Sequence, residues 1–522
     1  MLNIVLFDIS NENFGVQILT AILKKAGHIV NVIYHPADPI TLNNNYLSKN
    51  IIDQFANEII AEKPDIVGFS AFTDTFKLCC QIAAKIKEKN CHIKTLFGGI
   101  HTTLTMGKII EKEFIDFVIL GEAENAIVEF LEEFEKDRNY RKVQNLVYKN
   151  EGQIHINQCR PYLRNLDSLP FADKDAYFQK NKNVGYQYLL VSSRGCPFCC
   201  TYCSTNATRK LYPLEKNHFR KRSVENVIEE LKYAKLKYKP KVIRFFDDIF
   251  VSDFDWLSKF KDIYLKEINL ELSCMVHVKY LKKNTIRLLK DIGVRMVDMG
   301  LQTANETYRK KYLNRWEKND EVKQAIEILR DNGIKTSLHH ILGLPGDDIK
   351  SIENSIKTYS TWSPGYFIDV YWLNYYPNIE IIDTAKQMGL LTAQDETLIT
   401  DGEYNINYAQ FDPRRFDNDY IKCAIYLHLL GILPGKHVRW LLKYKKFIIP
   451  SNLLLKIFSF ISRVVVNRQT WTLGLLKLIL LNKIRQWFSA TNNKINFCCN
   501  FWKIVPKRNK GEIKNLLDQP VK

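Results

Sequence analysis

The feature that most constrains the fold of this chain is a repeated alternation of short apolar runs with helix-forming segments. Between residues 1 and about 140, runs such as Ile4–Phe7 and Ile66–Phe69 end at small or polar residues and are followed by amphipathic stretches. Apolar strands that alternate with helices predict a parallel sheet covered on both faces. Such sheets bind ligands beyond the carboxyl ends of their strands.

The same alternation resumes from about residue 187 to residue 385. The six candidate strands are Tyr188–Ser192, Val242–Phe246, Leu272–Val276, Met296–Leu301, Lys335–Leu342 and Phe367–Leu373. Six repeats predict a partial (β/α)6 barrel with its active site at the strand carboxyl ends. At 522 residues the chain is also too long for a single core.

We therefore expect an α/β protein with four parts. These are a doubly wound, Rossmann-like sheet domain, a connector, a partial TIM-like barrel and a basic helical C-terminal region. Their expected bounds are residues 1–140, 141–182, 183–405 and 406–522.

Four of the 12 cysteines crowd into eight residues directly after the strand that opens the second stretch. With the spacing Cys196-x3-Cys200-x2-Cys203, three thiolates can bind three irons of a [4Fe–4S] cluster and leave the fourth iron open. The alternative is a structural zinc site, which normally takes four ligands, often as two separated pairs. No second spaced pair of cysteines follows, and adjacent Cys199 and Cys200 are poorly arranged to bind one metal, so the spacing favours iron–sulfur.

This segment resembles the signature of the radical S-adenosylmethionine superfamily, and the resemblance continues over residues 185 to 390. Further segments resemble, in order, the family's RxRS, FxDD, GxES and GLPGE motifs. They are Phe219–Ser223, Phe245–Asp248, Met299–Thr303 and Leu342–Gly346.

The resemblance implies that the open iron binds S-adenosylmethionine, which is cleaved to a 5′-deoxyadenosyl radical. It places Tyr202 near the adenine, Asp247 and Asp248 near the methionine amino group, Gln302 at the ribose and Gly343 beside the adenosine. Gln302 departs from the family's usual Glu. Ordinary helix N-capping is the alternative reading for one of the two aspartates.

Residues 1 to 140 resemble the cobalamin-binding domain that often precedes such a core. The matching strand-end residues are Ser70, Gly98, Gly99, Gly121 and Glu122. Glycines let the backbone lie against a nucleotide tail. The alternative is that these positions are ordinary loops of a doubly wound fold.

One departure from the cobalamin pattern concerns the lower axial ligand. Family members that supply a histidine carry Asp-x-His-x-x-Gly after the first strand, but here the chain reads Asp8-Ile9-Ser10. We therefore expect cobalamin to bind without a protein histidine ligand.

The net charge of +18 belongs almost entirely to one segment. Between Asp419 and Glu512 the sequence has 17 Lys and Arg and no acid, interleaved with apolar runs and Trp. This composition is typical of helices at an anionic membrane surface. A helical cap packed on the barrel is an equal alternative, and nucleic acid ranks last because no RNA-binding motif is present.

The sequence thus predicts a cobalamin-dependent radical enzyme that methylates an unactivated carbon of a small-molecule or lipid-like substrate. It would need a reducing electron donor of the flavodoxin or ferredoxin type. The alternatives are a radical cyclisation or oxidation without net methyl transfer, and a non-catalytic metal-binding, membrane-docking protein. Without an export signal or an apolar run of about 18 residues, the expected location is the cytoplasm, with the basic segment as a candidate peripheral contact at the inner face of the membrane.

Overall fold

The computed structural model describes most of the chain in two compact units. The described residues are 1–36, 49–136, 139–181, 186–362, 365–404, 418–444, 448 and 450–467. The first unit comprises Met1–Glu271, Lys310–Arg315 and Leu373–Asp412, and the second comprises Leu272–Arg309, Trp316–Trp372 and Pro413–Lys522.

The first unit opens with the expected parallel sheet. Its strand order is β2-β1-β3-β4-β5-β6-β7, in which the first five strands are parallel. The five strands are β1 (Asn3–Ser10), β2 (Ile29–Pro36), β3 (Ile66–Ser70), β4 (Lys94–Gly98) and β5 (Phe117–Ile119). The helices between and after them are α1 (Phe14–Lys25), α2 (Lys49–Ala61), α3 (Phe76–Lys89), α4 (Ile100–Leu104) and α5 (Glu124–Glu135).

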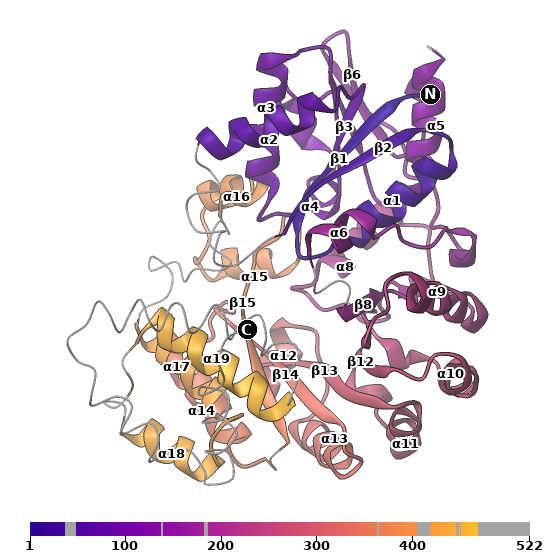
Figure 1. The fold of residues 1–522 in the computed structure, drawn as a ribbon. Helices are drawn as coiled ribbons and strands as arrows, with labels where there is room; N and C mark the ends of the chain where they lie inside the picture. Colours follow the sequence, from indigo (N-terminus) through magenta and orange to yellow (C-terminus); the bar gives the residue numbers. More distant parts are fainter. Residues whose placement is uncertain are drawn as a thin grey trace, which may run out of the picture. The chain divides into compact units, whose positions relative to one another are not determined.

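Alternate residues of β1 enter two different cores, which explains why helices lie on both faces of this sheet (Figure 1). Val5 and Phe7 pack in the core formed with α2 and α3, whereas Ile4 and Leu6 pack in the core formed with α1 and α5. Because successive strand side chains point to opposite faces, a strand that is apolar throughout must be covered twice. The doubly wound prediction is confirmed.

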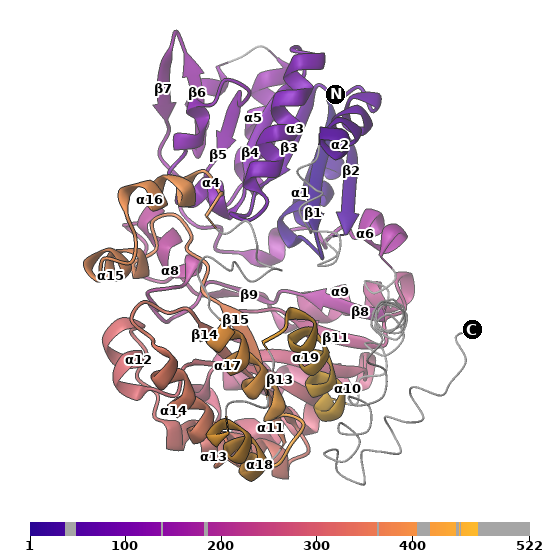
Figure 2. The same ribbon diagram turned by 90° about the vertical axis from the view of Figure 1, so that its left-hand side faces the viewer.

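The sheet extends further than its parallel part. β6 (Leu146–Asn150) and β7 (Gln153–Ile156) add to it antiparallel, beside β5 (Figure 2). These strands lie within residues 141–182, which the sequence presented as a connector. The domain bounds proposed above stay a prediction.

The rest of the first unit carries the start of the second strand–helix stretch. β8 (Gln187–Leu190) pairs in parallel with β11 (Val242–Phe245), and β9 (Ser193–Arg194) pairs antiparallel with β10 (Arg220–Lys221). The helices of this part are α6 (Asp175–Lys180), α8 (Ser204–Thr208), α9 (Val224–Lys237), α10 (Phe254–Glu267), α15 (Ile381–Gln387) and α16 (Ala393–Thr400).

The second unit contains four parallel strands in sequence order. They are β12 (Glu271–Val276, from Leu272 onward), β13 (Val294–Gln302), β14 (Lys335–Leu342) and β15 (Tyr366–Trp372). Helix α11 (Lys283–Ile292) follows β12, helices α12 (Glu306–Tyr312) and α13 (Asn319–Asp331) follow β13, and helix α14 (Ile349–Tyr359) follows β14. The last three residues of α12 belong to the first unit. All six strands expected in this stretch are therefore present.

The described part of the basic C-terminal region is helical, as predicted. It forms α17 (Asn418–Leu429), α18 (Gly435–Lys443) and α19 (Asn452–Asn467). Helix α17 packs against α14, α19 and β15, and a Cβ atom on Gly431 would lie 2.8 Å from the Cβ of Phe367. These helices thus form a tightly packed cap on the second unit, while residues 468–522 lie outside the described part.

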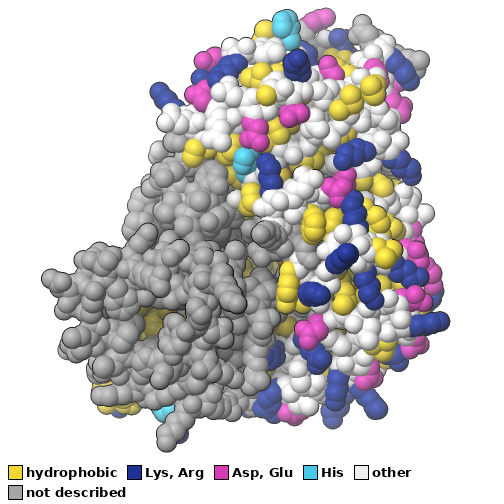
Figure 3. All heavy atoms as spheres, in the orientation of Figure 1, with side chains coloured by type: hydrophobic (Ala, Val, Ile, Leu, Met, Phe, Trp, Pro, Cys, Tyr) yellow, Lys and Arg dark blue, Asp and Glu magenta, His cyan; other side chains and the backbone are white. Residues whose placement is uncertain are grey.

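Charges of both signs are interspersed on the coloured face in Figure 3, in keeping with a body that is nearly neutral without the C-terminal segment. Among the described residues, no helix combines the length and apolarity needed to cross a membrane.

Candidate cofactor sites

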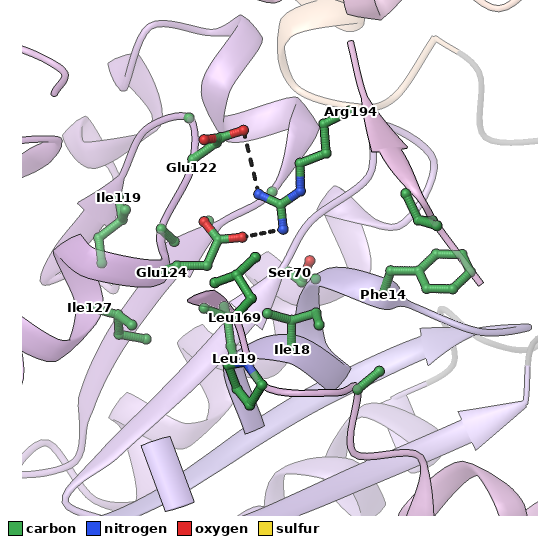
Figure 4. A pocket seen from close by; sticks show the side chains of 18 of the residues that line it. Phe14, Ile18, Leu19, Ser70, Ile119, Glu122, Glu124, Ile127, Leu169 and Arg194 are labelled. Carbon is green, nitrogen blue, oxygen red and sulfur yellow. Dashed lines mark ion pairs between the residues drawn. The ribbon is translucent and has the colours of Figure 1, made fainter. Parts of the chain in front are cut away.

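A cavity of about 360 Å³ lies in the first unit, at the carboxyl ends of the parallel strands. All five strand-end residues singled out from the sequence line it, namely Ser70, Gly98, Gly99, Gly121 and Glu122. Apolar side chains supply much of the remaining wall, including those of Phe14, Ile18, Leu19, Ile119, Ile127 and Leu169 (Figure 4). The cavity combines exposed backbone with an apolar wall, as small-molecule sites commonly do.

Two adjacent glycines in this wall have different roles. Gly99 has a φ of +93°, and a Cβ atom there would lie 2.8 Å from the backbone N and O of Ala71. A Cβ atom on Gly98 would meet nothing closer than the Ile119 carbonyl oxygen at 3.8 Å. Gly99 is therefore required by the fold, whereas the missing side chain of Gly98 leaves space beside the cavity.

A partly buried group of ion pairs lines one side of the cavity. The Arg194 guanidinium, on β9, lies 2.6 Å from Glu124 and 3.4 Å from Glu122 (Figure 4). Glu122 also pairs with Arg220 at 2.7 Å and accepts a hydrogen bond from the Leu163 backbone N–H. Burial opposes ionisation of Glu124, but the adjacent Arg194 outweighs it and lowers the pKa of Glu124. Through Arg220 and Leu163, Glu122 links the end of β5 to β10 and to the segment after β7.

Ser10 occupies the position where related domains carry the ligand histidine. Its hydroxyl donates to Asp8 Oδ2 at 2.7 Å, and the same oxygen accepts from Tyr177 Oη at 2.8 Å. Asn13 Nδ2 donates both to Asp8 Oδ1 at 3.0 Å and to Ser70 Oγ at 3.2 Å. Burial raises the pKa of Asp8, and these hydrogen bonds oppose that rise. The polar groups at the end of β1 are thus engaged with one another.

Three histidines of the sheet domain, His28, His35 and His101, have partners of their own. His101 is fully buried between Thr73 Oγ1 at 3.1 Å and the Thr400 carbonyl oxygen at 3.0 Å, and burial lowers its pKa to about 4. His35 pairs with Glu58 at 2.9 Å, and His28 Nδ1 accepts from the Leu2 backbone N–H at 3.4 Å. His101 fixes residues 373–404 to the sheet domain.

The cysteine loop has little regular structure and is held by hydrogen bonds to Arg209, just beyond it, and to residues 312–314. Arg209 donates to the carbonyl oxygens of Cys196 and Phe198, and Asn314 Nδ2 donates to the Cys199 carbonyl oxygen at 3.0 Å. Thr201 donates from its hydroxyl to the Tyr312 carbonyl oxygen at 2.6 Å. Gly195, with φ +82°, is required here because a Cβ atom would lie 1.9 Å from the His218 carbonyl oxygen.

The four cysteines of the loop differ in their surroundings. Cys200 is buried, Cys196 and Cys203 are partly buried, and Cys199 is exposed with its Sγ 2.7 Å from Arg209 Nη1. Burial raises the pKa of Cys196 to about 12, and the charges of Asp248, Cys203 and Cys200 add to the rise. The sulfurs of Cys196, Cys200 and Cys203 must lose their protons to bind metal.

The spacing of the sulfur atoms bears on the zinc alternative. Among the described residues, three His, Cys, Asp or Glu ligand atoms lie within 4.8 Å of one another only at Asp298, His339 and Asp369. Tetrahedral zinc with Zn–S bonds of about 2.3 Å holds its sulfurs about 3.8 Å apart. The loop thiols do not form such a preformed group among the described residues, and the preference for an iron–sulfur cluster rests on the spacing of the cysteines in the sequence.

Asp247 and Asp248, just after β11, differ in burial. Asp247 is fully buried, and its Oδ1 accepts from the Ser192 backbone N–H at 3.0 Å and from the hydroxyls of Ser192 and Ser193 at 2.9 and 2.5 Å. Burial raises its pKa, and its Oδ2 has no hydrogen-bond partner among the described residues. Asp248 is exposed, yet the surrounding protein and the charge of Asp247 raise its pKa.

The N-capping alternative for this pair is wrong. The N-cap of helix α10 is Asp253, whose side chain accepts from the Trp256 backbone N–H, and neither Asp247 nor Asp248 occupies a cap position. Asp247 instead joins the ends of β8 and β11, beside the cysteine loop.

Tyr202 lies within the loop and contacts Arg315. The Arg315 Nη1 donates to Tyr202 Oη at 3.1 Å and lies 3.9 Å from Cys200 Sγ. Burial raises the pKa of Tyr202, which Arg315 partly offsets. Arg315 was not singled out from the sequence, because it is 112 residues beyond Cys203 and no local pattern marks it.

The other two predicted S-adenosylmethionine contacts lie in the second unit. Gln302 ends β13 and has a φ of +75°, and Gly343 follows β14 with a φ of +77°. A positive φ costs a non-glycine residue about 1–3 kcal/mol and recurs at ligand sites. Gln302 pairs with His340, which is three residues before Gly343. Gln302 and Gly343 therefore lie at the same end of the neighbouring strands β13 and β14.

The comparisons with known proteins agree with this organisation. Residues 190–359 match the Radical SAM superfamily, and residues 8–131 match the B12 binding domain. An uncharacterized methyltransferase of Pyrococcus horikoshii is 27% identical over 352 residues, which cover 66% of this chain and 72% of that protein. The anaerobic magnesium-protoporphyrin IX monomethyl ester cyclase of Rubrivivax gelatinosus is 27% identical over 361 residues, or 65% of this chain and 60% of the cyclase.

Two solved structures share the fold. The radical S-adenosylmethionine methyltransferase TsrM from Kitasatospora setae, with cobalamin and a [4Fe–4S] cluster bound, gives a TM-score of 0.61 at 14% identity, covering 90% of this chain and 100% of TsrM. The cobalamin-dependent enzyme OxsB with aqua-cobalamin bound gives 0.59 at 13% identity, covering 99% of this chain and 83% of OxsB.

The first unit thus contains two candidate cofactor sites, namely the strand-end cavity of its sheet domain and the cysteine loop that follows β8 and β9. The two matched domains identify those cofactors. The chain carries a Radical SAM domain and a B12 binding domain, the two domains that together characterise cobalamin-binding radical S-adenosylmethionine enzymes.

Proposed function

We propose that this enzyme transfers a methyl group from S-adenosylmethionine to an unactivated carbon of a small-molecule or lipid-like substrate. The observation that carries the two-cofactor basis of the proposal is the convergence of the five strand-end residues on one cavity, in the same unit as the cysteine loop. The similarity to the Pyrococcus horikoshii methyltransferase supports methyl transfer as the reaction. When bound, the two cofactors supply an electron for cleaving S-adenosylmethionine and a carrier for the methyl group.

In this proposal the cavity holds the nucleotide arm of cobalamin. Its volume suits a nucleotide-sized group, and the open space at Gly98 and the apolar side chains of Phe14 and Ile18 fit an aromatic base. The Ser70 hydroxyl, positioned by Asn13, would hydrogen-bond the arm. With Ser10 bonded to Asp8, the chain would offer no imidazole to the cobalt from this position.

The cysteine loop would bind the cluster through Cys196, Cys200 and Cys203. Asp248, exposed and just beyond the end of β11, would accept hydrogen bonds from the ammonium group of S-adenosylmethionine, since a charged pair is stronger than a neutral one. Tyr202 would lie near the adenine. Gln302 and Gly343 would contact the ribose and adenosine from the strand ends of the second unit.

A second candidate reaction is a radical cyclisation or oxidation without net methyl transfer. It is favoured by the similarity to the Rubrivivax gelatinosus cyclase, whose identity to this chain equals that of the Pyrococcus horikoshii methyltransferase. Both reactions would use the same cofactors, so the residues of the two sites do not separate them.

Methyl-labelled S-adenosylmethionine separates the two reactions. The enzyme, purified without oxygen and reconstituted with iron, sulfide and cobalamin, would be incubated with a low-potential reductant and an extract of candidate substrates. Methyl transfer predicts a product that carries the deuterated methyl group by mass spectrometry. A product that changes mass without the label, while 5′-deoxyadenosine forms, would support cyclisation or oxidation instead.

Two partners complete the proposal. The reductant would be a flavodoxin- or ferredoxin-type protein, and the basic C-terminal region would contact an anionic membrane surface. Support for the second comes from α18, which exposes Lys436, Arg439, Trp440 and Lys443 on the packed cap. Flotation with anionic vesicles at low salt tests it, and a protein that stays unbound there would exclude membrane contact.

A further inference from the structure

The two chain segments that hold the cysteine loop also form the surface beside it. These segments are residues 209–216 and residues 310–314, and both belong to the first unit together with the loop. Arg209, which opens the first segment, donates to two carbonyl oxygens of the loop. Asn314, which ends the second segment, donates to a third at 3.0 Å. The side chains that these segments expose therefore lie beside the loop.

This surface carries an excess of positive charge. The two segments hold five Lys and Arg and a single acid, Glu215, which pairs with Arg164. Four of the five basic side chains are exposed, namely those of Lys210, Lys216, Lys310 and Lys311. The start of α15, which also contacts the loop, adds two exposed acids, Glu380 and Asp383, and these reduce the excess without reversing it. The excess is local, because the chain outside the basic C-terminal segment is nearly neutral.

An exposed apolar side chain lies within the same surface. Leu214 is 86% exposed, more than any other large apolar side chain among the described residues. Two turns, closed by the hydrogen bonds from the Tyr212 N–H to Arg209 and from the Glu215 N–H to Tyr212, keep it near Arg209. A single exposed leucine is ordinary on a protein surface. Among lysines, however, it supplies an apolar contact, and the centres of protein interfaces are depleted of charged residues.

The cluster proposed for the loop must receive its electron from outside the chain, and electron transfer slows steeply with distance. From these contacts and charges we propose that Lys210, Leu214 and Lys311 belong to a docking surface for a small acidic electron carrier. One electron passes from the reduced carrier to the oxidised cluster, and no bond forms or breaks. Complexes of this kind are small and transient, and opposite charges speed their formation. The inference rests on the proposed cluster and not on the proposed methyl transfer.

Stopped-flow reduction of the full-length, cluster-loaded protein by reduced flavodoxin tests this surface. A double variant that combines Lys210→Glu and Lys311→Glu should lower the second-order rate constant about tenfold or more at low ionic strength, because the reversed charges repel an acidic carrier. High salt should narrow the difference. Leu214→Ser should also slow the reaction, and its exposed position makes it harmless to the fold. The dissociation constant of oxidised flavodoxin, measured by biolayer interferometry, should rise in both variants.

The matched control combines Lys25→Glu and Lys136→Glu. These exposed lysines lie at the far ends of α1 and α5, two helices whose first residues line the cavity. The control reverses the same number of charges and should react like the unaltered protein.

Reduced methyl viologen, a small molecule that needs no docking surface, should reduce the cluster of every variant at nearly the same rate. A missing cluster is thereby told apart from lost docking. If K210E/K311E binds flavodoxin and is reduced by it as well as the control is, the docking surface is excluded. Equal slowing of K25E/K136E would show an effect of overall charge and would also overturn the proposal.

Discussion

The strand-end cavity and the cysteine loop both follow parallel strands of the first unit, yet they are built differently. Regular structure fixes the cavity, because its backbone belongs to β3, β4 and β5 and its wall to α1 and α5. The loop has no such frame and depends on hydrogen bonds that Arg209 and Asn314 donate and that the Tyr312 carbonyl oxygen accepts. A rigid sheet can present a binding space that is formed before the ligand arrives. The backbone of a loop without regular structure is instead held in place by hydrogen bonds to other segments.

The largest effect expected from this difference is loss of the cluster on removal of a single ligand. Cys196→Ala, Cys200→Ala and Cys203→Ala should each lower iron content to background and abolish 5′-deoxyadenosine formation, because an open cubane site needs all three thiolates. Iron analysis and visible absorption measure this.

Cys199→Ala is the matched control for those variants. Its thiol is exposed and contacts Arg209, so the variant should keep both cluster and activity. If C199A loses iron while C196A retains it, the assigned set of ligands is wrong.

In the cavity, by contrast, the expected effect is weaker cobalamin binding when a larger side chain takes up its space. Gly98→Leu should leave the fold and cluster intact, because a Cβ there meets no atom closer than 3.8 Å, but should weaken hydroxocobalamin binding about tenfold or more. Gly99→Ala should reduce the yield of folded protein, since its Cβ would contact the Ala71 backbone and its φ is positive. Equilibrium dialysis and thermal unfolding separate the two effects. A folded G98L that binds cobalamin normally would place the cofactor elsewhere.

Arg315 tests how far the loop depends on distant side chains. Arg315→Met removes the donor to Tyr202 and the positive charge beside Cys200, so the reduction potential of the cluster should become more negative, on the order of tens of millivolts. Arg315→Lys should restore part of the shift. Potentiometry with iron content as the folding control measures this, and an unchanged potential in R315M would contradict the role given to Arg315.

The smallest expected effect is a change in protein stability on substitution of Asp347, in the loop after β14, and this change depends on pH. Burial raises the pKa of Asp347 to about 6, and the neighbouring Ser351 hydroxyl offsets only part of that rise. A folded-state pKa above the unfolded value means that stability falls as the pH rises from about 4 to 6. Asp347→Asn should therefore stabilise the protein above pH 6, by at most about 3 kcal/mol, with little effect below pH 4.

The adjacent Asp348 is the matched control for this prediction. It caps α14 by accepting from the Ser351 backbone N–H, so Asp348→Asn should be nearly neutral and Asp348→Ala should destabilise by about 1 kcal/mol. Thermal unfolding from pH 4 to 8 compares them. Stabilisation by D347N that is independent of pH would argue against an ionised, buried Asp347.

The sequence predicted the parts of the molecule that have a local periodicity. All six strands of the second stretch are present, and Ser70, Gly98 and Gly121 meet at one cavity because the carboxyl ends of parallel strands share an edge. The packed cap formed by α17 was one of the alternatives stated for the basic region. These features follow from hydrophobic pattern and strand order alone.

Features that depend on long-range register were missed. Arg194, Glu124 and Arg315 are far apart in sequence from the groups that they contact. β6 and β7 were not recognised as strands of the sheet. The close grouping of Asp298, His339 and Asp369 left a signal, since an acid in the middle of an apolar strand such as Phe367–Val370 is unusual, but only the sheet register shows that the three meet.

The central claim is that one chain holds both a three-cysteine cluster and cobalamin in the sites described. The most direct measurement is a joint analysis of iron, cobalamin and 5′-deoxyadenosine in protein purified and reconstituted without oxygen. We predict about four iron atoms and about one cobalamin per chain, with 5′-deoxyadenosine formed from S-adenosylmethionine only after reduction. A colourless protein that carries zinc, retains no cobalamin and leaves S-adenosylmethionine intact would contradict the account.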